Sequence, residues 1–389
     1  MAPNRTRILH VASHIGNIGD DASHAGLRKV INELLGEVEI DKLDIRKAYQ
    51  TYNLNDRWNF DSGFVKLANS YDLVIVGGGS YLDYSHPGTK SGATIDIPPE
   101  LVKKISVPLL ICSVSCRPRS KFDTINTDKI QTYLEALTSQ ENISLLVRND
   151  GSKDCVRRYI SSDIADRLTT VLDSGFFYEN DGLSYRPCEG DYISINTTRD
   201  QLGFYKRRIG EIDQAAYEQN IAAFVRRMIE ETDLNVVFAP HILADLPAIN
   251  GVLHHLPPYS AASRVAVMPY AQGSYGCRQI YSGYKNSRAA IGMRFHANAC
   301  GMAMGVPMIG LGATERVVDL FSSLGATSDL VDVTSPDFVD LLYAKVNLKI
   351  SDPADNESLR SVIESARSDT IMNYSKQLQR LGFQTNHTF

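Results

Sequence analysis

The sequence lacks three features that mark large classes of protein: long apolar runs, an excess of basic residues and paired metal-type cysteines. No apolar run approaches the roughly 18 residues of a membrane-spanning helix, and residues 8–12 are too short for the hydrophobic region of a signal peptide. The net charge of −5 supplies no positive field to attract nucleic acid or anionic lipid. The composition therefore predicts a soluble, cytoplasmic protein with no nucleic-acid partner and no transmembrane segment.

The cysteines and acidic residues show no pattern of a metal site. Cys112 and Cys116 stand four apart, but no second Cys/His pair follows at zinc spacing. Several of the six cysteines lie in apolar runs, which is typical of buried, reduced thiols in the cytoplasm. No Asp-x-Asp cluster is present, and the glycines after the first apolar run have the wrong spacing for a dinucleotide fingerprint. We expect no metal and no cofactor.

Short apolar runs alternate with helical segments along the whole chain, which predicts buried parallel strands and an α/β fold. In the first half the expected strands are residues 7–12, 39–45, 72–76, 107–113, 143–147 and 169–172. In the second half they are residues 192–196, 235–239, 265–268, 289–292, 307–311 and 330–333. Helices are expected at residues 21–35, 213–231 and 358–381, among others.

The length of 389 residues and a change of composition predict two domains. Residues 178–190 are polar and rich in turn formers, as in a linker. We expect one doubly wound, Rossmann-like domain at 1–180, a second at 191–350 and a closing C-terminal helix within 355–389. Ligands of such sheets bind at the carboxyl ends of the strands, so polar residues at these ends are the candidate site.

In the first half, two glycine-rich segments and one polar segment follow strands. Asn17 and Asp20 lie in the first segment, where they are suited to bind sugar hydroxyls, and Asp20 or Asp21 is a candidate base. The alternative for the two aspartates is that they cap the following helix. Gly78 and Gly79 indicate close approach of a ligand or of the partner domain. Arg148, at the end of a later strand, either holds a ligand or caps the helix that follows.

In the second half, basic side chains end three strands. Arg294 and His296 flank the start of a helix rich in small residues, and the free N–H groups of a helix start favour anions. Arg199 adds a second guanidinium, and His241 follows another strand. Together, Arg199, Arg294 and His296 could neutralise a small dianion. The alternative is that Arg294 forms a surface ion pair and His296 is an ordinary cap.

These segments, in this order and spacing, resemble the polysaccharide pyruvyl transferases over about residues 7 to 333. The matching pieces are residues 16–22 (Gly-Asn-Ile-Gly-Asp-Asp-Ala), 77–79 (Gly-Gly-Gly), 148–152 (Arg-Asn-Asp-Gly-Ser), 240–241 (Pro-His) with Asp245, and 294–297 (Arg-Phe-His-Ala) with 305–307 (Gly-Val-Pro). The resemblance implies a GT-B-like fold with an inter-domain cleft. It also implies transfer of the pyruvyl group of phosphoenolpyruvate to two hydroxyls of one sugar, which forms a cyclic ketal and releases phosphate.

The resemblance also implies roles for particular residues. His296, Asp20 and Asp21 are the catalytic candidates. The donor side comprises Arg199, Arg294, His296 and Arg316, and the acceptor side comprises Asn17, Gly78, Gly79, Arg148 and His241. Family members commonly carry a tyrosine and a lysine shortly after Gly-Val-Pro, whereas residues 310–316 here keep only the charge, as Arg316.

Two other functions stay open: a GT-B glycosyltransferase that uses a nucleotide sugar, and a non-catalytic carbohydrate-binding relative. The acceptor sugar is undefined and can be lipid-linked or polymeric. Peripheral attachment to the inner face of a membrane and formation of a homo-oligomer are likewise left open.

Overall fold

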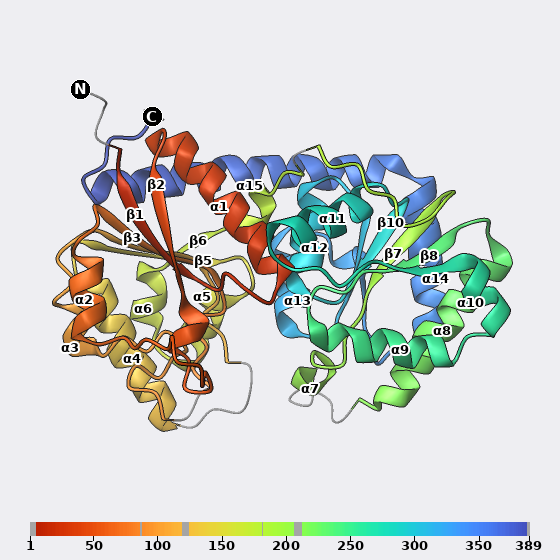
Figure 1. Ribbon diagram of the computed structural model, residues 1–389, viewed down its shortest axis with the longest axis horizontal. Coiled ribbons are helices and arrows are strands. Elements are labelled where there is room, and N and C mark those ends of the chain that lie inside the picture. The colour runs from red at the N-terminus through yellow and green to blue at the C-terminus, as the bar shows by residue number, and fades with distance from the viewer. Residues whose placement is uncertain (1–4, 86–87, 119–123, 181, 206–211, 387–389) are drawn as a thin grey trace. The chain divides into compact units, whose positions relative to one another are not determined.

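The computed structural model describes residues 5–85, 88–118, 124–180, 182–205 and 212–386. The chain divides into two compact units. The first unit comprises Met1–Ile15, His24–Phe177 and Ala366–Phe389, and the second unit comprises Gly16–Ser23 and Tyr178–Ser365. Each unit contains a six-stranded parallel sheet with helices packed against it, as Figure 1 shows, so the predicted α/β class is confirmed.

The sheet of the first unit has the strand order β2-β1-β3-β4-β5-β6, with parallel pairing throughout. Its strands are β1 (Arg7–Ala12), β2 (Glu39–Asp44), β3 (Leu73–Gly79), β4 (Leu109–Val114), β5 (Ile143–Arg148) and β6 (Thr169–Val171). Every residue of the three strands β3, β4 and β5 is buried, which explains why their sequences are mostly apolar.

The sheet of the second unit has the order β12-β11-β10-β7-β8-β9, also parallel. Its strands are β7 (Tyr192–Asn196), β8 (Asn235–Phe238), β9 (Val265–Val267), β10 (Ala289–Gly292), β11 (Met308–Leu311) and β12 (Leu330–Val331). Counted within the unit, this is the 3-2-1-4-5-6 order of a dinucleotide-binding domain, which reverses between β7 and β10. Such a reversal is where open α/β sheets bind their ligands.

The helices of the described chain lie between these strands or after the last of them. They are α1 (Ile18–Leu35), α2 (Ser62–Ala68), α3 (Pro99–Val102), α4 (Thr124–Thr138), α5 (Ser152–Tyr159), α6 (Ser162–Arg167), α7 (Leu202–Tyr205), α8 (Gln214–Glu231), α9 (Leu246–His254), α10 (Pro258–Arg264), α11 (Gly273–Lys285), α12 (Phe295–Ala303), α13 (Glu315–Ser323), α14 (Phe338–Ser351) and α15 (Pro353–Arg380). Short 3-10 turns occupy Ile45–Ala48, Ser174–Phe177, Leu243–Asp245 and Thr327–Asp329.

Two helices make the units differ from the expected contiguous domains. The first turns of α1 belong to the second unit, while the rest of α1 belongs to the first. Helix α15 is likewise divided, with residues up to Ser365 in the second unit and residues from Ala366 in the first. The segment expected as a linker joins the second unit from Tyr178 onward, apart from Asp181, which lies outside the described residues. The expected inter-domain cleft stays a prediction.

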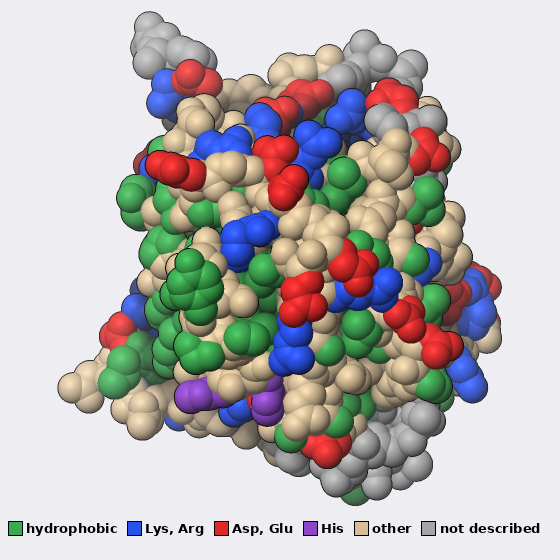
Figure 2. Space-filling view, turned by 90° about the vertical axis from the view of Figure 1, so that its right-hand side faces the viewer, with side chains coloured by type: hydrophobic (Ala, Val, Ile, Leu, Met, Phe, Trp, Pro, Cys, Tyr) green, Lys and Arg blue, Asp and Glu red, His purple; other side chains and the backbone are tan. Residues whose placement is uncertain are grey.

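Charged side chains of both signs are mixed on the surface, as expected for a chain with a small net charge. On the face seen in Figure 2, the described Lys and Arg side chains are interspersed with Asp and Glu. Among the described residues, none of the helices has both the length and the apolar composition needed to cross a membrane.

Candidate functional site

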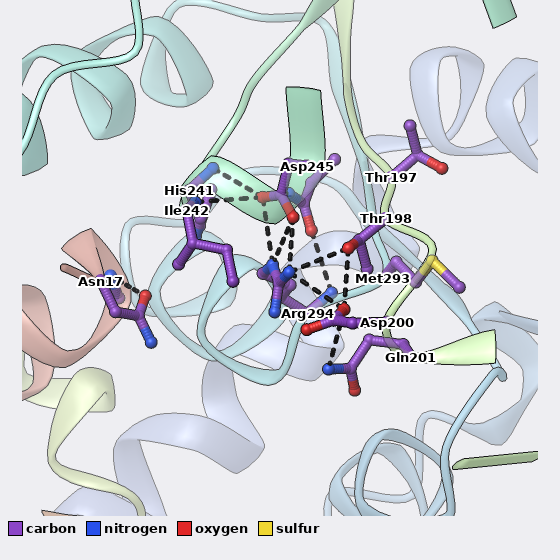
Figure 3. Close-up of polar contacts among 12 residues, drawn as sticks. Asn17, Thr197, Thr198, Asp200, Gln201, His241, Ile242, Asp245, Met293 and Arg294 are labelled. Carbon is purple, nitrogen blue, oxygen red and sulfur yellow. Dashed lines mark hydrogen bonds and ion pairs between the residues drawn. The ribbon is translucent and has the colours of Figure 1, made fainter. Parts of the chain in front are cut away.

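Arg294 connects the carboxyl ends of three neighbouring strands of the second unit. It follows β10 and precedes α12, and its backbone N–H donates to Asn196 Oδ1, at the end of β7, over 3.0 Å. Its Nε donates to both oxygens of Asp245, which lies beyond β8, at 2.9 and 3.1 Å. Its Nη2 reaches Thr198 Oγ1 at 2.9 Å and Asp200 Oδ1 at 3.0 Å. Figure 3 shows the guanidinium between the two carboxylates.

Asp245 is the buried partner of Arg294. Its Oδ2 also accepts from the backbone N–H of His241 at 2.8 Å and of Ile242 at 3.2 Å. Burial favours the neutral carboxyl, but the Arg294 guanidinium outweighs it, and the pKa of Asp245 is lowered from 3.8. The pair is therefore ionised at neutral pH.

Asp200 is the exposed partner of Arg294. Its side chain is 36% exposed, against 0% for Asp245 and 11% for Arg294. Its Oδ1 also accepts from the Thr198 hydroxyl at 2.7 Å. The Arg294 guanidinium is thus met by two carboxylates, so it is a partly buried ion-pair partner. The alternative interpretation placed Arg294 in a surface ion pair. The ion pair is present, but the surface position is wrong.

The other two predicted donor arginines lie apart from this contact set. Arg199 pairs with Glu218 of α8, with Nε 2.5 Å from Oε1 and Nη2 3.1 Å from Oε2. Arg316 lies half-buried in the first turn of α13. Arg199 and Arg294 are each met by a carboxylate, because a buried or half-buried guanidinium requires a partner to offset its desolvation. Neutralisation of a dianion by Arg199, Arg294 and His296 stays a prediction.

The start of α1 brings Asn17 and Asp20 to His296, which is in the first turn of α12. Asn17 Oδ1 accepts from the backbone N–H of Gly19 at 3.0 Å, and Asn17 Nδ2 donates to Asp20 Oδ1 at 2.9 Å. The same Asp20 oxygen lies 3.5 Å from His296 Nδ1. Asp21 follows in the same turn, half-buried, and its backbone N–H donates to the Asn17 carbonyl. Asn17 is thus the capping residue, and α1 begins at Ile18 rather than at the predicted position 21.

His241 is fully buried, and its Nε2 lies 2.9 Å from the Tyr284 hydroxyl. Burial is the main cause that lowers the pKa of His241 from 6.5 to about 3. Arg294 and His296 also lower this pKa, whereas Asp245 raises it. The imidazole is therefore neutral, and its contacts support the Asp245 turn. In this structure the side chain offers no surface to a sugar.

Gly78, Gly79 and Arg148 belong to the first unit, where protein groups surround them. Strand β3 continues through Gly79, and a Cβ at that position would lie 2.4 Å from the Tyr81 ring. Arg148 is 2% exposed and contacts Asp150 at 2.8 Å and Asp173 at 3.2 Å. Tyr81 thus lies close to Gly79, and Arg148 forms a buried ion network. The ligand contacts of the glycines and of Arg148 stay predictions.

The structure therefore unites Asn17, Asp20, Asp21, Arg294, His296 and His241 in the second unit. The sequence analysis assigned no role to Asp200, Asp245 or Glu218, the carboxylates that face the arginines. Asp200 and Asp245 follow strands, whereas Glu218 lies in α8. The pairing of Asp200 and Asp245 with Arg294 depends on β10 lying beside β7, and these two strands are distant in the chain.

A doubly wound sheet in each unit and a polar site at a strand-order reversal define a GT-B-like protein with two Rossmann-like domains. Solved structures share the fold. S. aureus MnaA in a co-structure with UDP aligns with a TM-score of 0.54 at 13% identity and covers 97% of each chain. A glycosyltransferase from Rickettsia africae aligns with a TM-score of 0.52 at 11% identity and covers 97% of this chain and 96% of its own.

The family is shown by sequence. The family model of the polysaccharide pyruvyl transferases matches residues 17–314, well over half of the chain. The chain belongs to the polysaccharide pyruvyl transferase family, which supports a transferase of polysaccharide pyruvylation. Among curated proteins, none matches the chain.

Proposed function

We propose that this protein transfers the pyruvyl group of phosphoenolpyruvate to two hydroxyls of one sugar, forming a cyclic ketal and releasing phosphate. Family membership supports pyruvyl transfer. The observation that carries the chemistry is the contact of Asp20 with His296, 3.5 Å apart, at the carboxyl edge of the second sheet. The contact places an imidazole and a carboxylate at the edge where such sheets bind their ligands.

The donor anion is proposed to bind Arg294 by exchange with Asp200. The guanidinium already holds two carboxylates, and Asp200 is the more exposed of the two. A carboxylate or phosphate of the donor takes the place of Asp200, while Asp245 keeps the guanidinium in position. The backbone N–H groups at the start of α12 add a favourable field for the anion. Arg199 and Arg316 stay proposed second contacts for the same anion.

The proton transfers follow from the reaction. His296, as the acid, protonates the methylene carbon of phosphoenolpyruvate while a sugar hydroxyl attacks C2. The attacking hydroxyl loses its proton to a base of the same site, for which the sequence offered Asp20 and Asp21 in the first turn of α1 as candidates. The C2–O bond to phosphate breaks, the second hydroxyl attacks C2, and its proton leaves with phosphate. The balance is phosphoenolpyruvate plus diol to ketal plus phosphate, with no metal or cofactor proposed.

The acceptor is a sugar, proposed to be lipid-linked or polymeric, and the protein is proposed to act in the cytoplasm. Asn17, Gly78 and Gly79 stay the proposed acceptor residues. Arg148 and His241 are left out, because both side chains are buried and bonded within the protein.

The test is phosphate release from phosphoenolpyruvate with a panel of galactose, glucose, mannose and N-acetylhexosamine glycosides. Release that depends on one acceptor and falls by about 10²- to 10⁴-fold in His296→Gln supports the proposal. The matched control is His255→Gln, an exposed histidine at the end of α9, which should keep wild-type turnover. Near-normal turnover in His296→Gln would remove the imidazole from the mechanism.

A nucleotide-sugar glycosyltransferase is the second candidate, favoured by one observation: MnaA, with a similar fold, was solved with UDP. A bound ligand raises the melting temperature, because it stabilises the native state. A shift with phosphoenolpyruvate but not with UDP supports pyruvyl transfer. The opposite pattern supports the glycosyltransferase, and sugar binding without phosphate release supports a non-catalytic relative.

A further inference from the structure

We propose that Asp20 is a positioning residue that acts through His296, rather than the base that takes the hydroxyl proton. Its carboxylate holds the Nδ1 side of the imidazole, so that the same imidazole gives a proton through Nε2 and takes one back. This inference rests on the proposed function for the identity of the proton acceptor, but the Asp20–His296 relation itself is measurable without turnover.

The first argument is that Asp20 is fixed before any ligand binds. Its Oδ1 accepts from Asn17 Nδ2 at 2.9 Å, and Asn17 is held in turn by the Gly19 N–H at 3.0 Å. The Asp20 backbone N–H donates to the Asn17 carbonyl at 3.1 Å. The side chain is only 13% exposed. A carboxylate tied down in this way is suited to orient a neighbour.

The second argument is the packing of Gly19 against His296. A Cβ at Gly19 would lie 2.6 Å from His296 Cβ and 3.0 Å from His296 Nδ1. Only a residue without a side chain allows this approach of the α1 start to the imidazole. The approach brings Asp20 Oδ1 to 3.5 Å from Nδ1, and hydrogen bonds of catalytic groups are often long before substrate binds.

The third argument is that the backbone of His296 is also anchored. Its carbonyl accepts from the buried Tyr281 hydroxyl at 3.1 Å, and its side chain is 9% exposed. With the backbone and Nδ1 both held, proton transfer takes place at Nε2. His296 delivers the Nε2 proton to the methylene carbon, becomes neutral, and receives the proton of the attacking hydroxyl at the same atom. The cycle returns the imidazolium, and the carboxylate of Asp20 stabilises its charge.

The experiment is ¹⁵N NMR of histidine-labelled protein at a pH about two units above the ordinary histidine pKa. The His296 resonances are assigned by their loss in His296→Gln. The wild type is expected to carry the proton on Nδ1, and Asp20→Asn is expected to shift it to Nε2. Replacing the carboxylate of such a pair by its amide lowers turnover by about 10⁴-fold. We therefore expect a kcat loss of about 10³- to 10⁴-fold with little change in the KM of phosphoenolpyruvate.

The matched control is Glu33→Gln, an exposed acid-to-amide change on the same helix, which should leave the tautomer and kcat unchanged. The proposal is overturned if His296 of the wild-type protein carries its proton on Nε2. This result needs no Asp20 variant, so it holds even if a variant misfolds. An unchanged tautomer in Asp20→Asn also overturns it. If the tautomer shifts but the wild type turns over no phosphoenolpyruvate, the positioning role stands and the proposed function fails.

Discussion

The Arg294 guanidinium lies against the buried Asp245 carboxylate, with Nε 2.9 Å from Oδ1 and 3.1 Å from Oδ2. Nη2 donates both to Asp245 Oδ1 and, at 3.0 Å, to Asp200 Oδ1, so the contacts with Asp245 fix the guanidinium plane. Asp245 thus holds the Arg294 guanidinium, and a second carboxylate, Asp200, also contacts it. The two aspartates should therefore respond differently to substitution.

Asp200→Asn should tighten donor binding. The change removes the exposed carboxylate that competes with the donor anion for Arg294, and an exposed ion pair of this kind is worth up to about 1 kcal/mol. We expect the KM of phosphoenolpyruvate to fall up to about five-fold, measured by initial rates of phosphate release. Asp340→Asn removes an exposed pair with Arg227 and serves as the matched control. An unchanged or higher KM in Asp200→Asn would contradict the exchange of anions at Arg294.

Gly19→Ala should impair turnover through His296. The new methyl group would lie 2.6 Å from His296 Cβ, so α1 or the imidazole must move. A displacement of about 1 Å lowers turnover by about 10²-fold, and overpacking costs about 1–3 kcal/mol of stability. Both are measured, by phosphate release and by urea unfolding. Gly203→Ala is the control, because a Cβ there meets none of the described atoms within 4 Å. Wild-type turnover in Gly19→Ala would show that the close approach is not required.

Acid should destabilise the protein partly through His241. Its folded pKa, about 3, lies below the ordinary 6.5, so between these values the unfolded state binds a proton that the folded state does not. The free energy of unfolding should fall as the pH falls through this window, by up to about 1.4 kcal/mol per pH unit for this group. His241→Gln should flatten that slope in urea unfolding from pH 7 to pH 4, while His255→Gln should not. Identical slopes in both variants would contradict the assignment.

We expect Arg148 to stabilise the fold rather than to bind the acceptor. Arg148→Met leaves Asp150 and Asp173 buried without their cation, which costs about 3–5 kcal/mol of the free energy of unfolding. Arg158→Met, at an exposed position of α5, should change it by less than about 0.5 kcal/mol. At a temperature where Arg148→Met is folded, the KM of the acceptor should match the wild type. A raised acceptor KM would instead support a contact of Arg148 with the sugar.

The fold was largely predictable from the sequence because parallel strands are buried on both faces. Strands such as β1, β7 and β10 coincide with their predicted residues, since continuous apolar runs bounded by turns leave few alternatives. The partners of Arg294 were not predictable. They depend on the spatial order of β8, β7 and β10, and no local pattern encodes which strands become neighbours. Gly79 illustrates the same limit: its requirement for a close contact was visible, but its partner, Tyr81, was not.

The start of α1 has a consequence for dissecting the protein. Gly16–Ser23 lies between β1 and β2 of the first sheet in the chain, yet it belongs to the second unit with Tyr178–Ser365. A fragment cut at the apparent linker would keep His296 and Arg294 but lose Gly19 and Asp20. His296 and the residues that contact it are thus supplied by distant parts of the sequence. Such a fragment therefore lacks part of the candidate site.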